Sequence, residues 1–138
     1  MFFKNNKNET KNDKLIKIAA LLIHTAKIDE DYSDQEESII KQTLLKIGAV
    51  DKNIENIIKE GKKIDQNSNQ ILDFTKEVKN MDSDDKIEIV EALWKIIYSN
   101  DVADIYESNL MRRLSGLLYI DNKTMGDIKE KIKNKISQ

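Results

Sequence analysis

Residues 15–36 read LIKIAALLIHTAKIDEDYSDQE, and this stretch decides the fold. Its first half is apolar at helical spacing except for a narrow polar stripe through Lys17 and His24, which predicts a largely buried helix. An acidic segment follows, and then Ser33 and Glu36 stand at the spacing of a capping box, the signature of a helix start. The stretch therefore predicts a buried helix, an acidic loop and a second helix.

Helical periods continue through the rest of the chain. Its 138 residues include four glycines and no proline, so few residues interrupt helices. We expect the helix after Ser33 to stop at Gly48 in a left-handed conformation, and the next helix to end near Gly61. The third to seventh helices are expected to begin near Asp51, Ser68, Ser83, Asp104 and Lys123. The sequence thus predicts a compact all-α bundle of about seven helices.

The apolar period also sets the expected domain boundaries. Residues 1–12 are rich in Asn and Lys and lack such a period, so we expect a flexible N-terminal tail there. Residues 13–138 are expected to form a single helical domain, because a chain of this length can bury about two-thirds of its surface around one core.

The two halves of the chain resemble each other at a shift of 71 residues, which places Asp29 on Asn100 and Glu36 on Glu107. The helical periods on either side of these residues also agree. This pattern predicts two pseudo-repeated helix, loop and helix halves, with residues 29–36 and 100–107 as the matched loops.

Composition argues against several classes of function. The net charge is −2 and Arg112 and Arg113 are the two arginines, which disfavours a surface that follows nucleic-acid phosphates. No apolar run approaches the roughly 20 residues that span a bilayer, so no transmembrane segment is expected. The lack of cysteine excludes disulfides and fits a reducing compartment. We therefore expect a cytoplasmic protein that does not bind nucleic acid.

The two acidic loops carry the candidate chemistry, because carboxylate and amide oxygens are the hard ligands that calcium and magnesium accept. The candidate metal ligands are Asp29, Asp31, Glu36, Asn100, Asp104 and Glu107. The first loop begins like an EF-hand, but Asp34 stands where that turn needs glycine and Ile40 where a bidentate Glu should stand. We expect a divalent cation site of another kind.

A second interpretation of the same glutamates needs no metal. Ser33 with Glu36, and Asp104 with Glu107, have the spacing with which paired side chains satisfy the free amides of a helix start. No catalytic constellation stands beside them: His24 has no histidine or cysteine partner, and glycine-rich phosphate loops are absent. We therefore expect a protein that is not an enzyme, with hydrolase chemistry that uses carboxylates and magnesium as a weaker alternative.

Residues 93–118, LWKIIYSNDVADIYESNLMRRLSGLL, resemble the second half of TerB-like bacterial proteins of the tellurite-resistance type. Those proteins typically read LW..ayADGe.d.yE..lirr...lL, and residues 26–36 resemble the matching pattern of their first half. The resemblance spans roughly residues 14–132. It places the family's acids on Asp29, Asn100, Glu36 and Glu107, with Asn100 a departure from the usual Asp.

The resemblance implies a seven-helix bundle with pseudo-twofold halves and a role in tellurite or general stress resistance. It also implies that the conserved acids are metal ligands. A domain related to this family begins a membrane-anchored co-chaperone of the DnaJ type. We therefore expect a non-enzymatic TerB-like protein whose acidic loops bind a divalent cation or a protein partner. The alternative is a helical adaptor or co-chaperone-associated module that docks a partner protein and uses its acids only as caps.

Overall fold

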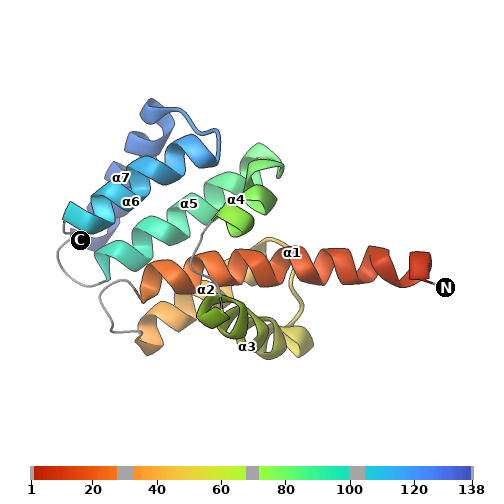
Figure 1. The fold of residues 1–138 in the computed structure, drawn as a ribbon. Helices are drawn as coiled ribbons and strands as arrows, with labels where there is room; N and C mark the ends of the chain where they lie inside the picture. Colours follow the sequence, from red (N-terminus) through yellow and green to blue (C-terminus); the bar gives the residue numbers. More distant parts are fainter. Residues whose placement is uncertain (1, 28–32, 68–71, 100–104, 138) are drawn as a thin grey trace.

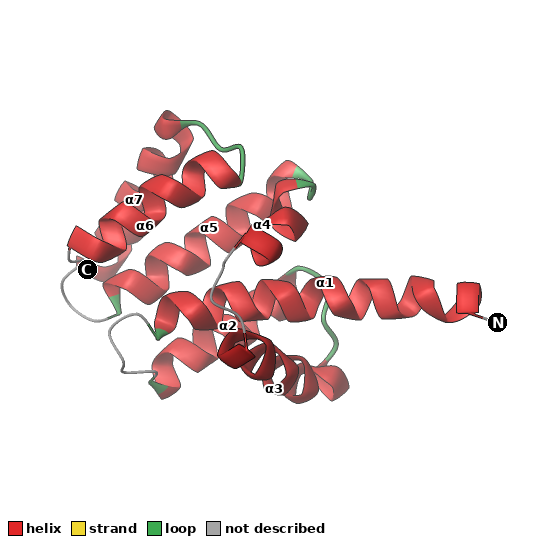
Figure 2. Cartoon of the chain, in the orientation of Figure 1, coloured by secondary structure: helices red, strands yellow, loops and turns green. Residues whose placement is uncertain are grey.

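The computed structural model describes residues 2–27, 33–67, 72–99 and 105–137, and within these ranges the regular structure is entirely helical (Figures 1 and 2). The seven helices are α1 (Phe2–Ala26), α2 (Asp34–Lys46), α3 (Asp51–Asn67), α4 (Leu72–Lys79), α5 (Ser83–Tyr98), α6 (Ile105–Leu117) and α7 (Asn122–Ser137). The all-α bundle of about seven helices is thereby confirmed. The internal duplication stays a prediction.

Two helices hold the bundle together. α1 packs against α2, α3, α4 and α5, and α5 packs in turn against α2, α4 and α7. Figure 1 shows α1 crossing the molecule, with α2 and α3 on one side and α4 to α7 on the other. The first of these helices was predicted to be largely buried, and apolar residues from 15 to 26 of α1 and from 89 to 97 of α5 both belong to the core.

The contact between α1 and α3 corrects the expected end of the third helix. α3 does not end near Gly61 but continues to Asn67. A Cβ atom on Gly61 would lie 3.0 Å from Ala19 Cβ and 3.2 Å from the Ala20 backbone nitrogen. Glycine is therefore placed here because the two helices approach closely, and not because the helix stops.

The beginning of α1 also differs from expectation. The helix starts at Phe2, within the segment expected to be a flexible tail, and Figure 1 shows its first turns projecting beyond the other helices. Residues 2–12 contain no proline or glycine, so nothing in them ends a helix. The apolar period starts at Leu15, the first core residue among the described side chains of α1, whereas the helix itself begins earlier. The flexibility of this segment stays a prediction.

The helix boundary at Gly48 is confirmed. Gly48 has a φ of 127°, and the N–H of Ala49 donates to the carbonyl of Leu44 at 2.9 Å, which is the bond of a Schellman motif. The chain therefore leaves α2 at this glycine and turns into α3. None of the helices in the described ranges is long and apolar enough to cross a membrane.

Candidate functional site

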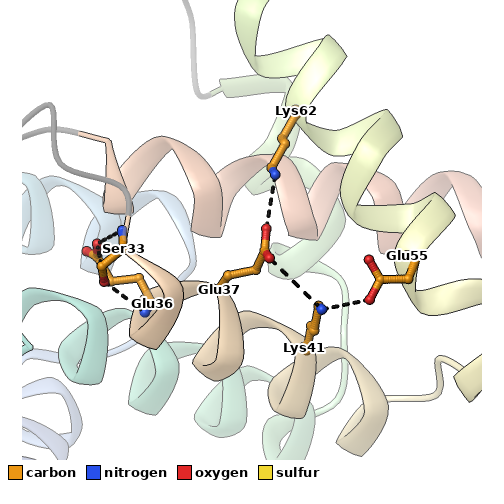
Figure 3. A network of polar contacts seen from close by, with 6 residues as sticks. All are labelled: Ser33, Glu36, Glu37, Lys41, Glu55 and Lys62. Atoms are coloured by element: carbon orange, nitrogen blue, oxygen red, sulfur yellow. Dashed lines mark hydrogen bonds and ion pairs between the residues drawn. The ribbon is translucent and has the colours of Figure 1, made fainter.

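The start of α2 is built as the predicted capping box (Figure 3). The backbone N–H of Ser33 donates to Glu36 Oε1 at 2.8 Å, and the N–H of Glu36 donates to Ser33 Oγ at 3.1 Å. The Ser33 hydroxyl also donates to Glu36 Oε1 at 3.1 Å. Two donors from one residue thus hold one oxygen of the Glu36 carboxylate in a fixed direction.

The burial of Glu36 goes beyond what a cap requires. The residue is 0% exposed, although glutamate side chains are mostly exposed in proteins. Glutamate is almost never fully buried unless its charge is compensated, because desolvation of a carboxylate is costly. The start of α2 therefore holds an oriented carboxylate inside the protein, directly after the acidic segment of the sequence.

The next glutamate has a different environment, in which it joins α2 to α3 (Figure 3). Lys62 Nζ lies 3.0 Å from Glu37 Oε1, and Lys41 Nζ lies 4.0 Å from Glu37 Oε2. Lys41 also approaches Glu55 at 2.6 Å, and this hydrogen bond raises the pKa of Lys41 above its usual value. Glu37 therefore serves the packing of two helices, whereas Glu36 points into the protein.

A second polar cluster joins the end of α1 to the last turns of α3. His24 Nδ1 lies 3.0 Å from Asp65 Oδ1, and Lys27 Nζ lies 3.3 Å from Asp65 Oδ2. The Asp65 side chain is 6% exposed. Sequence reasoning missed Asp65 because the third helix was expected to end before it. The signal was available in the spacing of Ile57, Ile64 and Asp65, which continues the helical period past Gly61.

Most of the chain matches the model of a known family. The family model described as tellurite resistance protein TerB matches residues 15–130. The chain belongs to the TerB family. The match begins at the first core residue of α1 and ends within α7, so it includes all of α2 to α6. No curated protein and no solved structure matches the chain.

Of the six residues predicted to bind metal in this TerB-family protein, the structure describes the side chain of one. Glu36 lies at the start of α2 as described. Asp29, Asp31, Asn100 and Asp104 lie outside the described residues, as does the side chain of Glu107 in α6. In the part of the chain that the structure describes, no three His, Cys, Asp or Glu side chains come together to hold an ion. The ligand set stays a prediction.

Proposed function

We propose that this chain is a non-enzymatic TerB-family protein of the stress-response or tellurite-resistance type, and that it binds a divalent cation at the start of α2. The observation that carries the proposal is the burial of Glu36, whose carboxylate is oriented by two hydrogen bonds from Ser33. Carboxylates that bind metal ions are commonly held by such outer hydrogen bonds, which fix the direction of the ligand.

The sequence before Glu36 supplies the further ligands of the proposed site. Asp29 and Asp31 stand four and two residues before Ser33, so the three predicted carboxylate ligands lie within eight residues. Calcium and magnesium prefer oxygen ligands of this type, and additional carboxylates offset the positive end of the helix dipole. The second loop has the neutral Asn100 where the first has Asp29. We therefore propose a weaker cation site there, with Asp104 and Glu107 as its acids.

The completed capping box favours a second candidate function. Because Glu36 already satisfies the Ser33 backbone N–H, it has a role in folding that needs no cation. On this alternative the chain is an adaptor, or a co-chaperone-associated module, that docks a protein partner through its helices. The two candidates differ in one property, which is whether a cation binds near Glu36.

Titration of the whole chain with calcium, magnesium, manganese and zinc, each followed by the amide resonances in NMR spectra, tests the proposal. We expect one of these ions to shift the amides of residues 29–37, and Glu36→Gln to weaken its binding at least about tenfold. Glu37→Gln is the matched control, because Glu37 is held by Lys62 and should leave the affinity unchanged. If no ion shifts these amides at millimolar concentration, the adaptor function is favoured instead.

A further inference from the structure

A cavity of about 380 Å³ opens where the start of α2 meets the last turns of α5 and α7. Its volume lies in the range of roughly 300–1,000 Å³ that small-molecule sites occupy. The walls include Gln35 and Ile39 of α2, Lys95 and Tyr98 of α5, and Ile132 and Lys135 of α7. In Figure 1 the C-terminal ends of α5 and α7 lie at the left of the molecule, close to the beginning of α2. Three helices distant in sequence thus contribute to one concave surface.

Two positive charges line this cavity, those of Lys95 and Lys135. Within the described ranges, neither Lys95 nor Lys135 forms an ion pair, although many other lysines of the chain do. Lys131, one turn before Lys135, lies 2.7 Å from Glu91. Among the residues that the structure describes, the cavity therefore brings together two ammonium groups that lack an ion-pair partner.

Each lysine has an ordinary explanation when considered alone. Lys95 is in the last turn of α5 and Lys135 in the last turn of α7, where a cation interacts favourably with the helix dipole. That explanation accounts for two separate lysines but does not require them to line one cavity. Their convergence is the feature that points to an anionic ligand.

The remaining walls supply hydrogen-bond donors and apolar surface. Burial raises the pKa of Tyr98, and Glu130 raises it further, so the Tyr98 hydroxyl stays protonated and can donate. The ring of Tyr98 is stacked on that of Trp94, with centroids 5.9 Å apart, which fixes its direction. Gln35 adds amide donors, whereas Ile39 and Ile132 offer surface that a fully polar ion would leave unused.

We propose that this cavity binds a small organic carboxylate, with its charge between Lys95 and Lys135 and its apolar body against Ile39 and Ile132. The site uses none of the acidic residues assigned to the cation. It is therefore independent of the proposed function, and either site can be present without the other.

NMR titration of the whole protein chain with sodium octanoate tests the proposal. Octanol is a neutral control with the same number of carbon atoms, and inorganic phosphate is a control anion without an apolar body. We expect octanoate to shift the amides of residues 35, 39, 95–99 and 132–135 and to bind more tightly than either control. Lys95→Gln and Lys135→Gln should each weaken octanoate binding about threefold, the effect of losing one partly exposed ion pair. Lys52→Gln, on the exposed surface of α3, should not weaken it.

The same measurements contain the results that would overturn the proposal. Binding of octanol as tight as that of octanoate would show an apolar groove without charge recognition, and equal binding of phosphate would show that the apolar walls contribute nothing. Unchanged octanoate affinity in both lysine variants, combined with lowered thermal midpoints, would show that these lysines serve only the helix ends. The result of the cation titration can be distinguished from that of the octanoate titration, because Glu36→Gln should leave the octanoate affinity unchanged.

Discussion

Gly61 of α3 lies so close to Ala19 of α1 that a Cβ atom on the glycine would be 3.0 Å from the Cβ of the alanine. The third neighbour, Ile23 Cδ1, belongs to a flexible side chain, but the Ala20 backbone nitrogen at 3.2 Å does not move easily. The close approach of these two helices therefore depends on the absence of a side chain at position 61.

We predict that Gly61→Ala destabilises the protein by about 1–3 kcal/mol, because the gain in helix propensity is smaller than the cost of overpacking. Urea unfolding measures the change. Gly126→Ala is the control, since nothing lies within 4 Å of a Cβ at that position of α7, and it should stabilise by about 0.5–1 kcal/mol. Stabilisation of similar size in both variants would contradict the close helix contact.

This contact also shows where inference from the sequence reaches its limit. Each helix could be predicted from the apolar period within its own segment. The capping box of Ser33 and Glu36 could be predicted from their spacing of three residues. The role of Gly61 depends on another helix, so the sequence could not distinguish a close contact from a helix end. The burial of Glu36 is non-local in the same way. The pairing of Asp65 was missed because it depended on the incorrectly predicted end of α3.

The cluster around Asp65 gives a second prediction. Asp65→Asn removes the charge that faces His24 and Lys27, and the nearly buried site cannot be rehydrated freely. We expect the free energy of unfolding to fall by about 1–3 kcal/mol. Glu60→Gln, on the same helix, breaks only the exposed pair with Lys63 and should cost at most about 1 kcal/mol. Equal losses in the two variants would contradict a structural role for Asp65.

The start of α7 gives a prediction about pH. Hydrogen bonds from the hydroxyl and the backbone N–H of Thr124 hold the pKa of Asp121 below its usual value. The folded pKa is lower than the unfolded one, so this carboxylate stabilises the protein fully above pH of about 4. The stabilisation is lost as the pH falls through the folded pKa of Asp121.

The matched variant for this effect is Asp121→Asn, because asparagine still accepts the capping hydrogen bond but does not titrate. We expect the free energy of unfolding of the wild type to fall more steeply below pH of about 4 than that of the variant. Urea unfolding across this pH range measures the difference, and Asp127→Asn controls for removal of an exposed charge from the same helix. Parallel pH profiles for wild type and Asp121→Asn would refute the prediction.

Glu36 is proposed to bind a divalent cation in addition to capping α2, and Glu36→Gln separates the two roles. Glutamine retains the capping-box pattern but lacks the charge that a cation requires. A cation that binds only the folded state stabilises it by about 2.7 kcal/mol at a concentration 100 times its dissociation constant.

The most direct test is the free energy of unfolding of wild type and Glu36→Gln, measured without added metal and with calcium, magnesium, manganese or zinc in excess. We predict that at least one ion stabilises the wild type by a few kcal/mol and the variant by much less. If every ion leaves the wild type unchanged, or stabilises both proteins equally, Glu36 is a helix cap and not a metal ligand.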